Sequence, residues 1–184
     1  MPDQCSSSGP EHPVVSVTWR EASDFCDWLT EKERALGQLP EGQIYRLPSD
    51  LEWSAAVGLP HEEGNTPAQR SGVLDGYPWG TNWPPPENAG NYSAELGVDQ
   101  YEFTSPVGSF AANQFGIYDL GGNVWEWCQD FIDRTQECRV LRGASWFNGY
   151  QDRLKSSFRN DLGHQDSRFS SFGFRVVLGS SLKR

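Results

Sequence analysis

Residues 113–127 decide the fold, and they read NQFGIYDLGGNVWEW. The paired glycines favour a tight turn, and the aromatic side chains are large enough to anchor a core. The rest of the chain has the same character, since 13% of its 184 residues are aromatic and only 36% are hydrophobic. Aromatic side chains are therefore expected to build the core. The 19 Gly and 12 Pro predict many turns and loops, which excludes a helical bundle, a coiled coil and a long repeat array.

The charge and the hydropathy pattern exclude several classes of protein. The 25 acidic and 15 basic residues give a net charge of −10, which repels phosphate backbones and excludes nucleic acid as a partner. No stretch reaches the roughly 18 apolar residues of a membrane span, so no membrane insertion is expected. The first residues have neither a basic region nor an apolar core, so we expect no secretory signal and synthesis in the cytoplasm. The final location stays open, and display on a cell or virus surface is one alternative.

The chain is expected to form one domain. Residues 1–12 are polar and predict a flexible lead-in, and residues 13–184 are assigned to a single domain without an internal repeat or linker. The four cysteines Cys5, Cys26, Cys128 and Cys138 are widely spaced, and their disulfide state stays open. Cys26 is interpreted as a small buried hydrophobic residue and not as a nucleophile.

Two capping boxes predict the helices. Thr18 and Glu21 open a helix that ends near Gly37, and Ser49 and Glu52 open a second, shorter helix. The apolar stripe of the first helix is expected to lie in the core, and its members are Ala22, Phe25, Cys26 and Leu29.

Short strands are expected around a long loop. Residues 14–17, 138–142, 154–159 and 172–178 are rich in residues that favour strands. Residues 58–114 are almost all loop in character, and a loop of that length needs metal ions or buried aromatic side chains to hold it in place.

Seven motifs in fixed order are similar to the formylglycine-generating-enzyme (sulfatase-modifying factor) family. They lie at residues 14–29, 45–53, 77–80, 104–110, 113–127, 142–146 and 173–176. The resemblance implies an α+β fold, the family's variant of the C-type lectin fold, with two helices, a small twisted antiparallel sheet and extensive loops. It does not by itself settle the function.

The enzymes of this family bind copper with two cysteines that lie between the motifs matching residues 142–146 and 173–176. Such a pair of soft thiolates suits Cu(I). In this sequence the stretch from Trp146 to Phe174 has no cysteine, so no copper and no enzymatic activity are expected. A formylglycine-generating type of oxidoreductase, or a diverged relative, is kept as an alternative.

Residues 147–172 resemble the variable region of proteins diversified by retroelements, in which template Asn codons are randomised. The run 168–175 matches a template of Arg, four Asn and Gly-Phe-Arg in which each Asn has been replaced. Large aromatic rings among small polar residues are also typical of binding loops. The predicted ligand-binding residues are Phe147, Asn148, Tyr150, Asp152, Phe158, Asp161, Leu162, His164, Ser167, Phe169, Ser170, Ser171 and Phe172.

The resemblance also implies two structural calcium sites. The first would use the side chains of Asn91 and Asp99 with the carbonyls of Tyr92 and Tyr101. The second would use the side chains of Asp119 and Glu126 with the carbonyls of Gly122 and Val124. These oxygen donors suit Ca²⁺, while the alternative is that they form ordinary turns. Arg142, Arg159 and Arg175 are expected to be structural, stacking on Trp and pairing with carboxylates.

The sequence thus predicts a non-catalytic protein that displays a hypervariable ligand-binding surface. The expected partner is a protein or a surface glycan, bound through a few aromatic anchors. Besides the oxidoreductase, an intracellular scaffold or effector domain with one fixed partner is an alternative. The identity of the ligand and the oligomeric state stay open.

Overall fold

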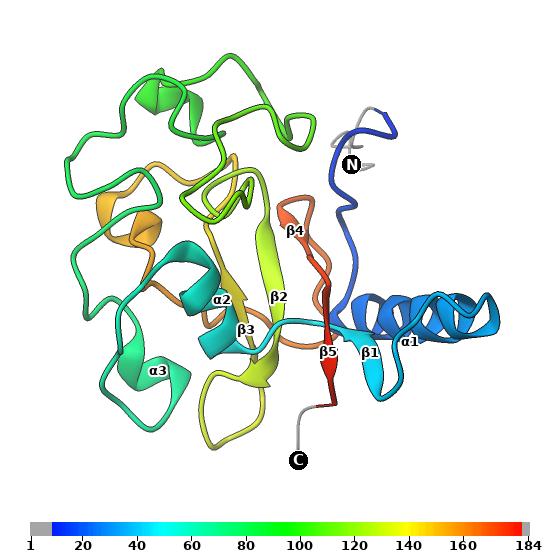
Figure 1. Cartoon of the computed structure of the whole chain (residues 1–184). Helices are drawn as coiled ribbons and strands as arrows, with labels where there is room; N and C mark the ends of the chain where they lie inside the picture. The colour runs from blue at the N-terminus through cyan, green and yellow to red at the C-terminus, as the bar shows by residue number, and fades with distance from the viewer. Residues whose placement is uncertain (1–8, 182–184) are drawn as a thin grey trace.

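The computed structural model describes residues 9–181, so most of the predicted lead-in and Cys5 lie outside the described part (Figure 1). Its helices and strands, in chain order, are α1 Trp19–Ala35, β1 Gln43–Arg46, α2 Asp50–Val57, α3 Pro67–Arg70, the 3₁₀ turn η1 Ala94–Leu96, β2 Trp125–Phe131, β3 Arg139–Arg142, the 3₁₀ turn η2 Gln151–Leu154, β4 Phe172–Gly173 and β5 Val177–Ser180. The α+β class predicted from the sequence is confirmed.

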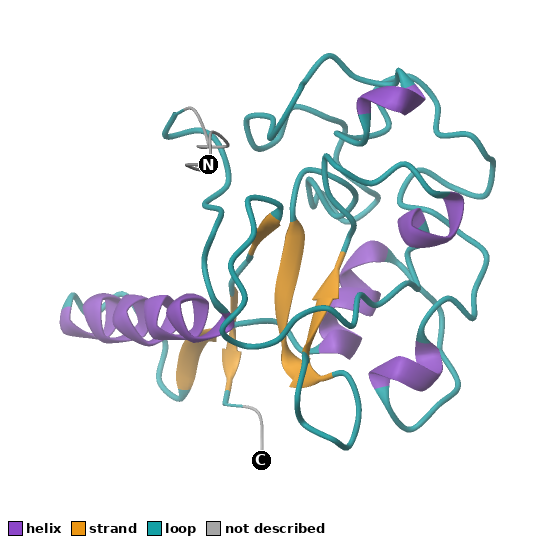
Figure 2. Cartoon of the chain, turned by 180° about the vertical axis from the view of Figure 1, so that it is seen from behind, coloured by secondary structure: helices purple, strands orange, loops and turns teal. Residues whose placement is uncertain are grey.

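The strands form two small sheets. In one, β2 is central, with β3 antiparallel on one side and the short β4 parallel on the other. In the other, β1 pairs with β5 antiparallel, with Gln43 opposite Ser180. Figure 2 shows α1 on the side of this second sheet and the short helices with most of the loops on the opposite side. The sheet of β2, β3 and β4 is therefore mixed, because β4 runs parallel to β2. An antiparallel sheet was expected from the sequence.

Both predicted capping boxes are present. Thr18 and Ser49 each accept from the amide three residues on, and Glu21 and Glu52 each accept from the capping residue's amide. Gly58 ends α2 with φ +88°, in the left-handed region that favours glycine.

The apolar stripe of α1 is only partly buried. Ala22 and Cys26 are buried as expected, whereas Phe25 is 42% exposed. Its ring lies 5.5 Å from the rings of Trp28 and Phe174 at the surface. The expectation that Phe25 belongs to the core was therefore wrong, because no further layer covers this side of the helix in the described residues.

Two of the predicted strands are wrong and one is interrupted. Residues 14–17 form no strand, because Ser16 has φ +58° and its amide donates to the Phe169 carbonyl (3.1 Å) instead of to a neighbouring strand. Residues 154–159 leave η2 through a turn that Ser157 ties to Leu74. Residues 172–178 are split into β4 and β5, which belong to different sheets.

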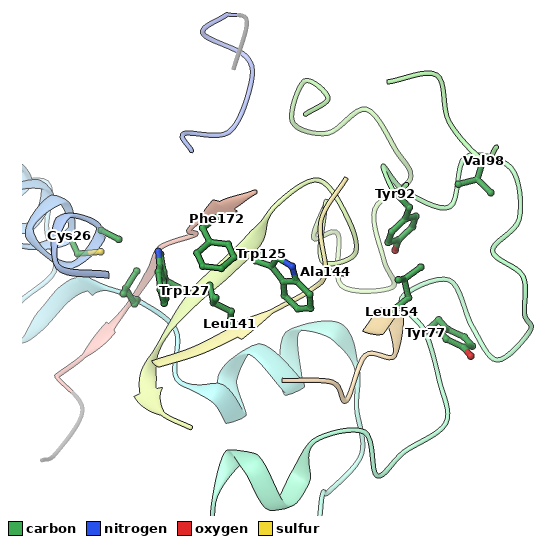
Figure 3. Packing of buried hydrophobic residues seen from close by; sticks show 12 residues of the cluster. Cys26, Tyr77, Tyr92, Val98, Trp125, Trp127, Leu141, Ala144, Leu154 and Phe172 are labelled. Atoms are coloured by element: carbon green, nitrogen blue, oxygen red, sulfur yellow. The ribbon is translucent and has the colours of Figure 1, made fainter. Parts of the chain in front are cut away.

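Aromatic side chains build the core, as the composition predicted. Trp125, Trp127, Leu141 and Phe172 belong to one buried cluster, in which Trp127 lies on the side of α1 (Figure 3). The long segment 58–114 contains only α3 and η1, and Tyr77 and Tyr92 anchor it to this core. Among the described residues, no helix is both long and apolar enough to cross a membrane.

Candidate ligand-binding face

The predicted ligand-binding residues differ in exposure. Seven are exposed: Phe147, Tyr150, Asp152, Asp161, Leu162, His164 and Phe169. Five are half-buried: Asn148, Phe158, Ser167, Ser170 and Ser171. Phe172 is buried, with only 5% of its surface exposed. The expectation that Phe172 is displayed was therefore wrong.

Phe172 is buried because β4 places it beside the central strand. Its backbone lies opposite Trp125 in the parallel pair. Its ring packs edge-on against Trp127, with 5.4 Å between the ring centres, and lies 4.9 Å from Phe169. The residue thus belongs to the core and supports the exposed Phe169 from below.

Seven of the predicted residues surround one cavity of about 330 Å³, which we call the apolar cup. Trp125, Asn160 and Phe172 are buried and form its floor, and we call Phe147, Tyr150, Leu162 and Phe169 its rim. The remaining lining residues are Asn148, Arg153 and Ser171. Sequence reasoning missed Trp125, Arg153 and Asn160, because Trp125 lies far away in the sequence and the other two were not singled out within the segment.

Hydrogen bonds fix the loops that carry the rim. The Asn148 Oδ1 accepts from the amide and the hydroxyl of Ser145, at 3.0 and 2.8 Å. The Asn160 Oδ1 accepts from the Leu162 amide at 2.9 Å. The Trp125 amide donates to the Ser171 carbonyl at 2.7 Å. The rim residues are therefore held in place by backbone hydrogen bonds and by the Asn148 and Asn160 side chains, and not by their own side chains.

The other six predicted residues do not line the cup. Phe158 is half-buried against Trp125, with 6.0 Å between the ring centres, and the Arg153 guanidinium lies 5.5 Å from its ring. The Asp152 carboxylate pairs with Lys155 at 3.1 Å. Asp161, His164, Ser167 and Ser170 also lie outside the lining of the cup.

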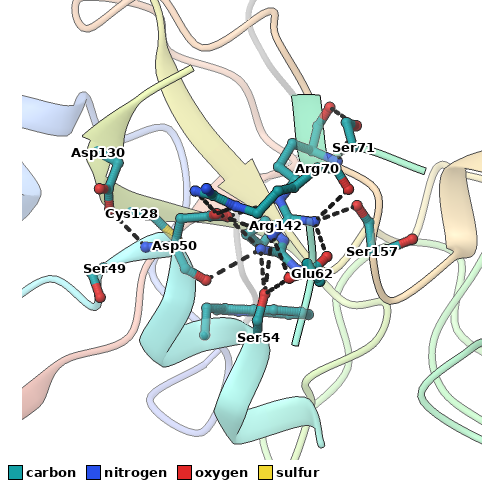
Figure 4. A network of polar contacts seen from close by, with 12 residues as sticks. Ser49, Asp50, Ser54, Glu62, Arg70, Ser71, Cys128, Asp130, Arg142 and Ser157 are labelled. Carbon is teal, nitrogen blue, oxygen red and sulfur yellow. Dashed lines mark hydrogen bonds and ion pairs between the residues drawn. The ribbon is translucent and has the colours of Figure 1, made fainter. Parts of the chain in front are cut away.

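A buried ionic network joins α2, α3, β3 and the segment after η2 (Figure 4). Asp50 pairs with Arg142, with Arg159 (Nε to Oδ1, 2.9 Å) and with Arg70 (3.0 Å). Arg159 also pairs with Glu62. Burial alone would raise the pKa of Asp50, but Arg142 and Arg159 outweigh it and hold that pKa below its usual value.

The predicted structural roles of the arginines are confirmed. The Arg142 guanidinium lies 4.3 Å from the Trp53 ring, and Arg175 pairs with Glu126. The sequence did not reveal Asp50 and Glu62 as the partners of Arg142 and Arg159. An acidic residue near a short helix gives no sign in the sequence of whether it is buried or exposed to solvent.

The first expected calcium position has one unsatisfied oxygen. Asn91 is fully buried, and its Nδ2 donates to the Phe103 carbonyl at 2.8 Å, but its Oδ1 accepts no hydrogen bond from the described residues. Asp99 accepts from the amides of Tyr92 and Tyr101, at 2.9 and 2.8 Å, as in an ordinary turn. Leaving a buried oxygen unpaired costs roughly 1–3 kcal/mol. These residues therefore fit an oxygen-liganded cation.

The second expected calcium position fits Ca²⁺ poorly. The Glu126 carboxylate accepts from Arg175 on both oxygens, at 2.5 and 2.6 Å, and from the Trp53 indole at 2.8 Å. Asp119 accepts from the Gly108 amide at 2.7 Å, and burial raises the pKa of its carboxyl group. The Arg175 guanidinium thus supplies the positive charge that the ion would bring to Glu126.

Among the described residues, the cysteines form no disulfide with one another. Cys26 and Cys128 are buried and Cys138 is half-buried. Burial raises the pKa of Cys26 to about 11 and that of Cys128 well above its usual value. Because the thiolate is the reactive and metal-binding form, these side chains behave as structural residues near neutral pH.

The architecture is the C-type lectin-like fold in its formylglycine-generating-enzyme variant. The chain belongs to the family of the sulfatase-modifying factor enzyme 1-like domain, whose model matches residues 2–179. The structure of Treponema denticola variable protein 1 has the same fold, with a TM-score of 0.61 and 24% identity over 93% of this chain and 73% of that one.

The curated relatives include an inactive protein and an enzyme. The chain is 31% identical to the inactive C-alpha-formylglycine-generating enzyme 2 of Bos taurus, over 92% of this chain and 51% of the relative. It is also 31% identical to the formylglycine-generating enzyme of Thermomonospora curvata, over 96% of this chain and 58% of the relative. The chain therefore spans about half the length of these relatives.

Proposed function

We propose that this protein is a non-catalytic binding protein that holds a protein or surface-glycan ligand on the apolar cup. The observation that carries the proposal is the exposure of the rim: Phe147, Tyr150, Leu162 and Phe169 are 71, 78, 62 and 53% exposed around one cavity. Contiguous exposed apolar side chains mark interaction sites. Rigid aromatic anchors over a buried floor are the groups that carry most binding energy in interfaces.

The face is proposed to be hypervariable, as in proteins diversified by retroelements. The loops are attached through backbone groups and through the Asn148 and Asn160 side chains, so the rim side chains can change while the backbone stays in place. The lining residues Asn148 and Phe172 are not free to change in this way, because one fixes a turn and the other fills the core. A reverse-transcriptase gene beside the coding sequence, with an Asn-rich near-copy of its 3′ end, would support this part. A neighbourhood with neither would favour a domain with one fixed partner.

We propose that the protein has no formylglycine-generating activity, because its described cysteines do not provide a reactive thiolate pair. The described cysteines have raised pKa values, and the stretch between Trp146 and Phe174 has none. We expect no aldehyde when the protein is incubated with Cu(I) and a cysteine-containing sulfatase peptide. Turnover above the rate without protein would favour the oxidoreductase alternative.

Binding is tested with a displayed peptide library and a glycan array. A double variant, Tyr150→Ser with Phe169→Ser, removes two rim anchors, and Phe115→Ser is the matched control because Phe115 is 58% exposed and does not line the cup. Ligands selected on the unchanged protein should lose at least about tenfold in affinity for the rim variant, as expected for anchor residues, and keep it for the control. Ligands that bind all three proteins equally would overturn the proposal.

We further propose that Ca²⁺ binds at the first position, held by Asn91 and Asp99. The ion would fix the loop that carries them and would stabilise the native state. A chelator should then lower the melting temperature of the protein, and Asp99→Asn should remove this effect. An unchanged melting temperature together with a metal-free elemental analysis would contradict the proposal.

A further inference from the structure

A second cavity of about 270 Å³ lies in the loop region, and it shares no lining residue with the apolar cup. The loops at residues 78–89 and 110–113 and the turn at 117–121 enclose it. They belong to the loop-rich side of the molecule, drawn in green in Figure 1. The proposed ligand face does not use this cavity.

Two aromatic rings line the cavity, and both are held in place. The Trp79 ring is stacked on Tyr77, with 4.7 Å between the ring centres, and its indole nitrogen donates to the Asn82 carbonyl at 2.9 Å. The Phe110 ring meets the Tyr101 ring edge-on at 6.2 Å. Fixed aromatic rings attract cations through the negative charge of their faces.

The ionisable side chains that line the cavity are both acidic. They are Glu87 and Asp119, and no Lys, Arg or His is among the lining residues. Asp119 is half-buried, and one of its oxygens accepts from the Gly108 amide at 2.7 Å. Among the described residues, no cationic side chain pairs with it, because the Arg175 guanidinium pairs with Glu126 and otherwise donates to the backbone carbonyls of Tyr118 and Asp119. Asp119, whose carboxylate makes no ion pair among the described residues, therefore lines the same cavity as the two aromatic rings.

We propose that this cavity binds a small organic ammonium ion, with Asp119 supplying the opposite charge and Trp79 and Phe110 the aromatic walls. A bare metal ion suits the site poorly, because Ca²⁺ needs about six to eight oxygen ligands and only two carboxylates and two amide side chains are among the lining residues. An alkylammonium group is weakly hydrated and is attracted by both features. The volume lies just below the usual range of ligand pockets, so the ion has few non-hydrogen atoms.

The test compares choline with its neutral carbon isostere, 3,3-dimethylbutan-1-ol, by titration calorimetry and by the shift of the Trp79 indole signal in NMR. Choline should bind saturably, and the isostere should bind at least about tenfold more weakly, because charge-assisted contacts exceed neutral ones. Equal binding of both compounds, or no saturable binding of choline, would overturn the proposal.

Variants identify the groups responsible. Asp119→Asn should weaken choline about tenfold, and Phe110→Leu, which keeps an apolar wall but removes the ring, should weaken it about threefold. Glu63→Gln is the control, because this exposed carboxylate lies outside the cavity. An unchanged affinity in Phe110→Leu would show that the ring makes no contribution and would overturn the aromatic part even if Asp119→Asn failed to fold.

Two further arms define the ligand. Adding CaCl₂ should leave the affinity for choline unchanged, and displacement of choline by Ca²⁺ would assign Asp119 to a metal site and overturn the proposal. N-acetyl-trimethyllysine amide distinguishes the sources of the ammonium group: tighter binding than choline indicates a peptide side chain, and weaker binding a free ion. Both outcomes support an ammonium site.

Discussion

At the residue scale, exposure is decided by backbone position and not by side-chain type. Phe169 and Phe172 are three residues apart in the predicted variable region, and their ring centres are 4.9 Å apart. Phe169 is 53% exposed and Phe172 is 5% exposed. The difference arises because Phe172 enters β4, which pairs with the buried strand β2. The same residue type thus serves the rim in one case and the core in the other.

Alanine substitution should separate these two roles. Phe172→Ala should lower the free energy of unfolding by about 3–5 kcal/mol, because it leaves a cavity beside Trp127. Tyr150→Ala should change it by less than about 0.5 kcal/mol, because the side chain is 78% exposed. Denaturant unfolding of the two variants measures both values. A loss of several kcal/mol in Tyr150→Ala would mean that the rim is part of the core.

A second residue-scale prediction concerns the buried network. Asp50→Asn leaves Arg142 and Arg159 buried without their shared carboxylate, so we expect a loss of about 3–5 kcal/mol in the free energy of unfolding. Asp75→Asn is the matched control, because Asp75 pairs with Lys155 while its own side chain is 93% exposed; exposed pairs contribute at most about 1 kcal/mol. Similar losses in the two variants would contradict a structural role for the buried network.

At the element scale, α2 couples its capping box to an ion pair. Glu52 accepts from the Ser49 amide at 2.8 Å and from both terminal nitrogens of Arg46 at 2.6 Å. Arg46 lies on β1, so this one carboxylate joins the start of α2 to the second sheet. Its hydrogen bonds to Arg46 and then to Ser49 lower the pKa of Glu52 to about 2.

The pKa of Glu52 predicts a pH dependence of stability. The group has a pKa of about 4.3 in unfolded chains, so its contribution to stability is complete above that pH and is lost as the pH falls towards about 2. Glu52→Gln should therefore flatten the dependence of unfolding free energy on pH in this interval and lower stability at neutral pH. The measurement is urea unfolding at a series of pH values, with Glu63→Gln as the exposed control. An unchanged slope in Glu52→Gln would contradict the assignment.

The elements with local signals were the ones that the sequence predicted. The capping boxes of α1 and α2 are short patterns whose chemistry is complete within four residues, and both are present. The expected strand at 154–159 has strand-like residues, but Ser157 bonds to Leu74, which is far away in the sequence. The floor of the cup likewise depends on Trp125, which β2 brings beneath the predicted segment. Such contacts join residues far apart in the chain, so no short sequence pattern predicts them.

At the scale of the whole molecule, stability and recognition are assigned to different parts. The aromatic core and the network around Asp50 hold the sheets and loops together, while the rim side chains project from turns that are fixed by other groups. A surface can change its side chains without loss of the fold only when this separation is present. The separation is therefore the physical requirement of the proposed hypervariable face.

Replacing the whole rim tests this separation. A variant with Phe147, Tyr150, Leu162 and Phe169 all changed to serine should keep its circular dichroism spectrum and melt within about 4 °C of the unchanged protein, since about 1 kcal/mol shifts the melting temperature of a protein of this size by roughly 2–4 °C. It should also bind none of the ligands selected on the unchanged protein. Trp127→Ala is the reference for the loss of a core side chain, because Trp127 is fully buried and its removal should lower the melting temperature strongly. If the rim variant melted as early as Trp127→Ala, residues 147–169 would be core, and a domain with one fixed partner would become the better account.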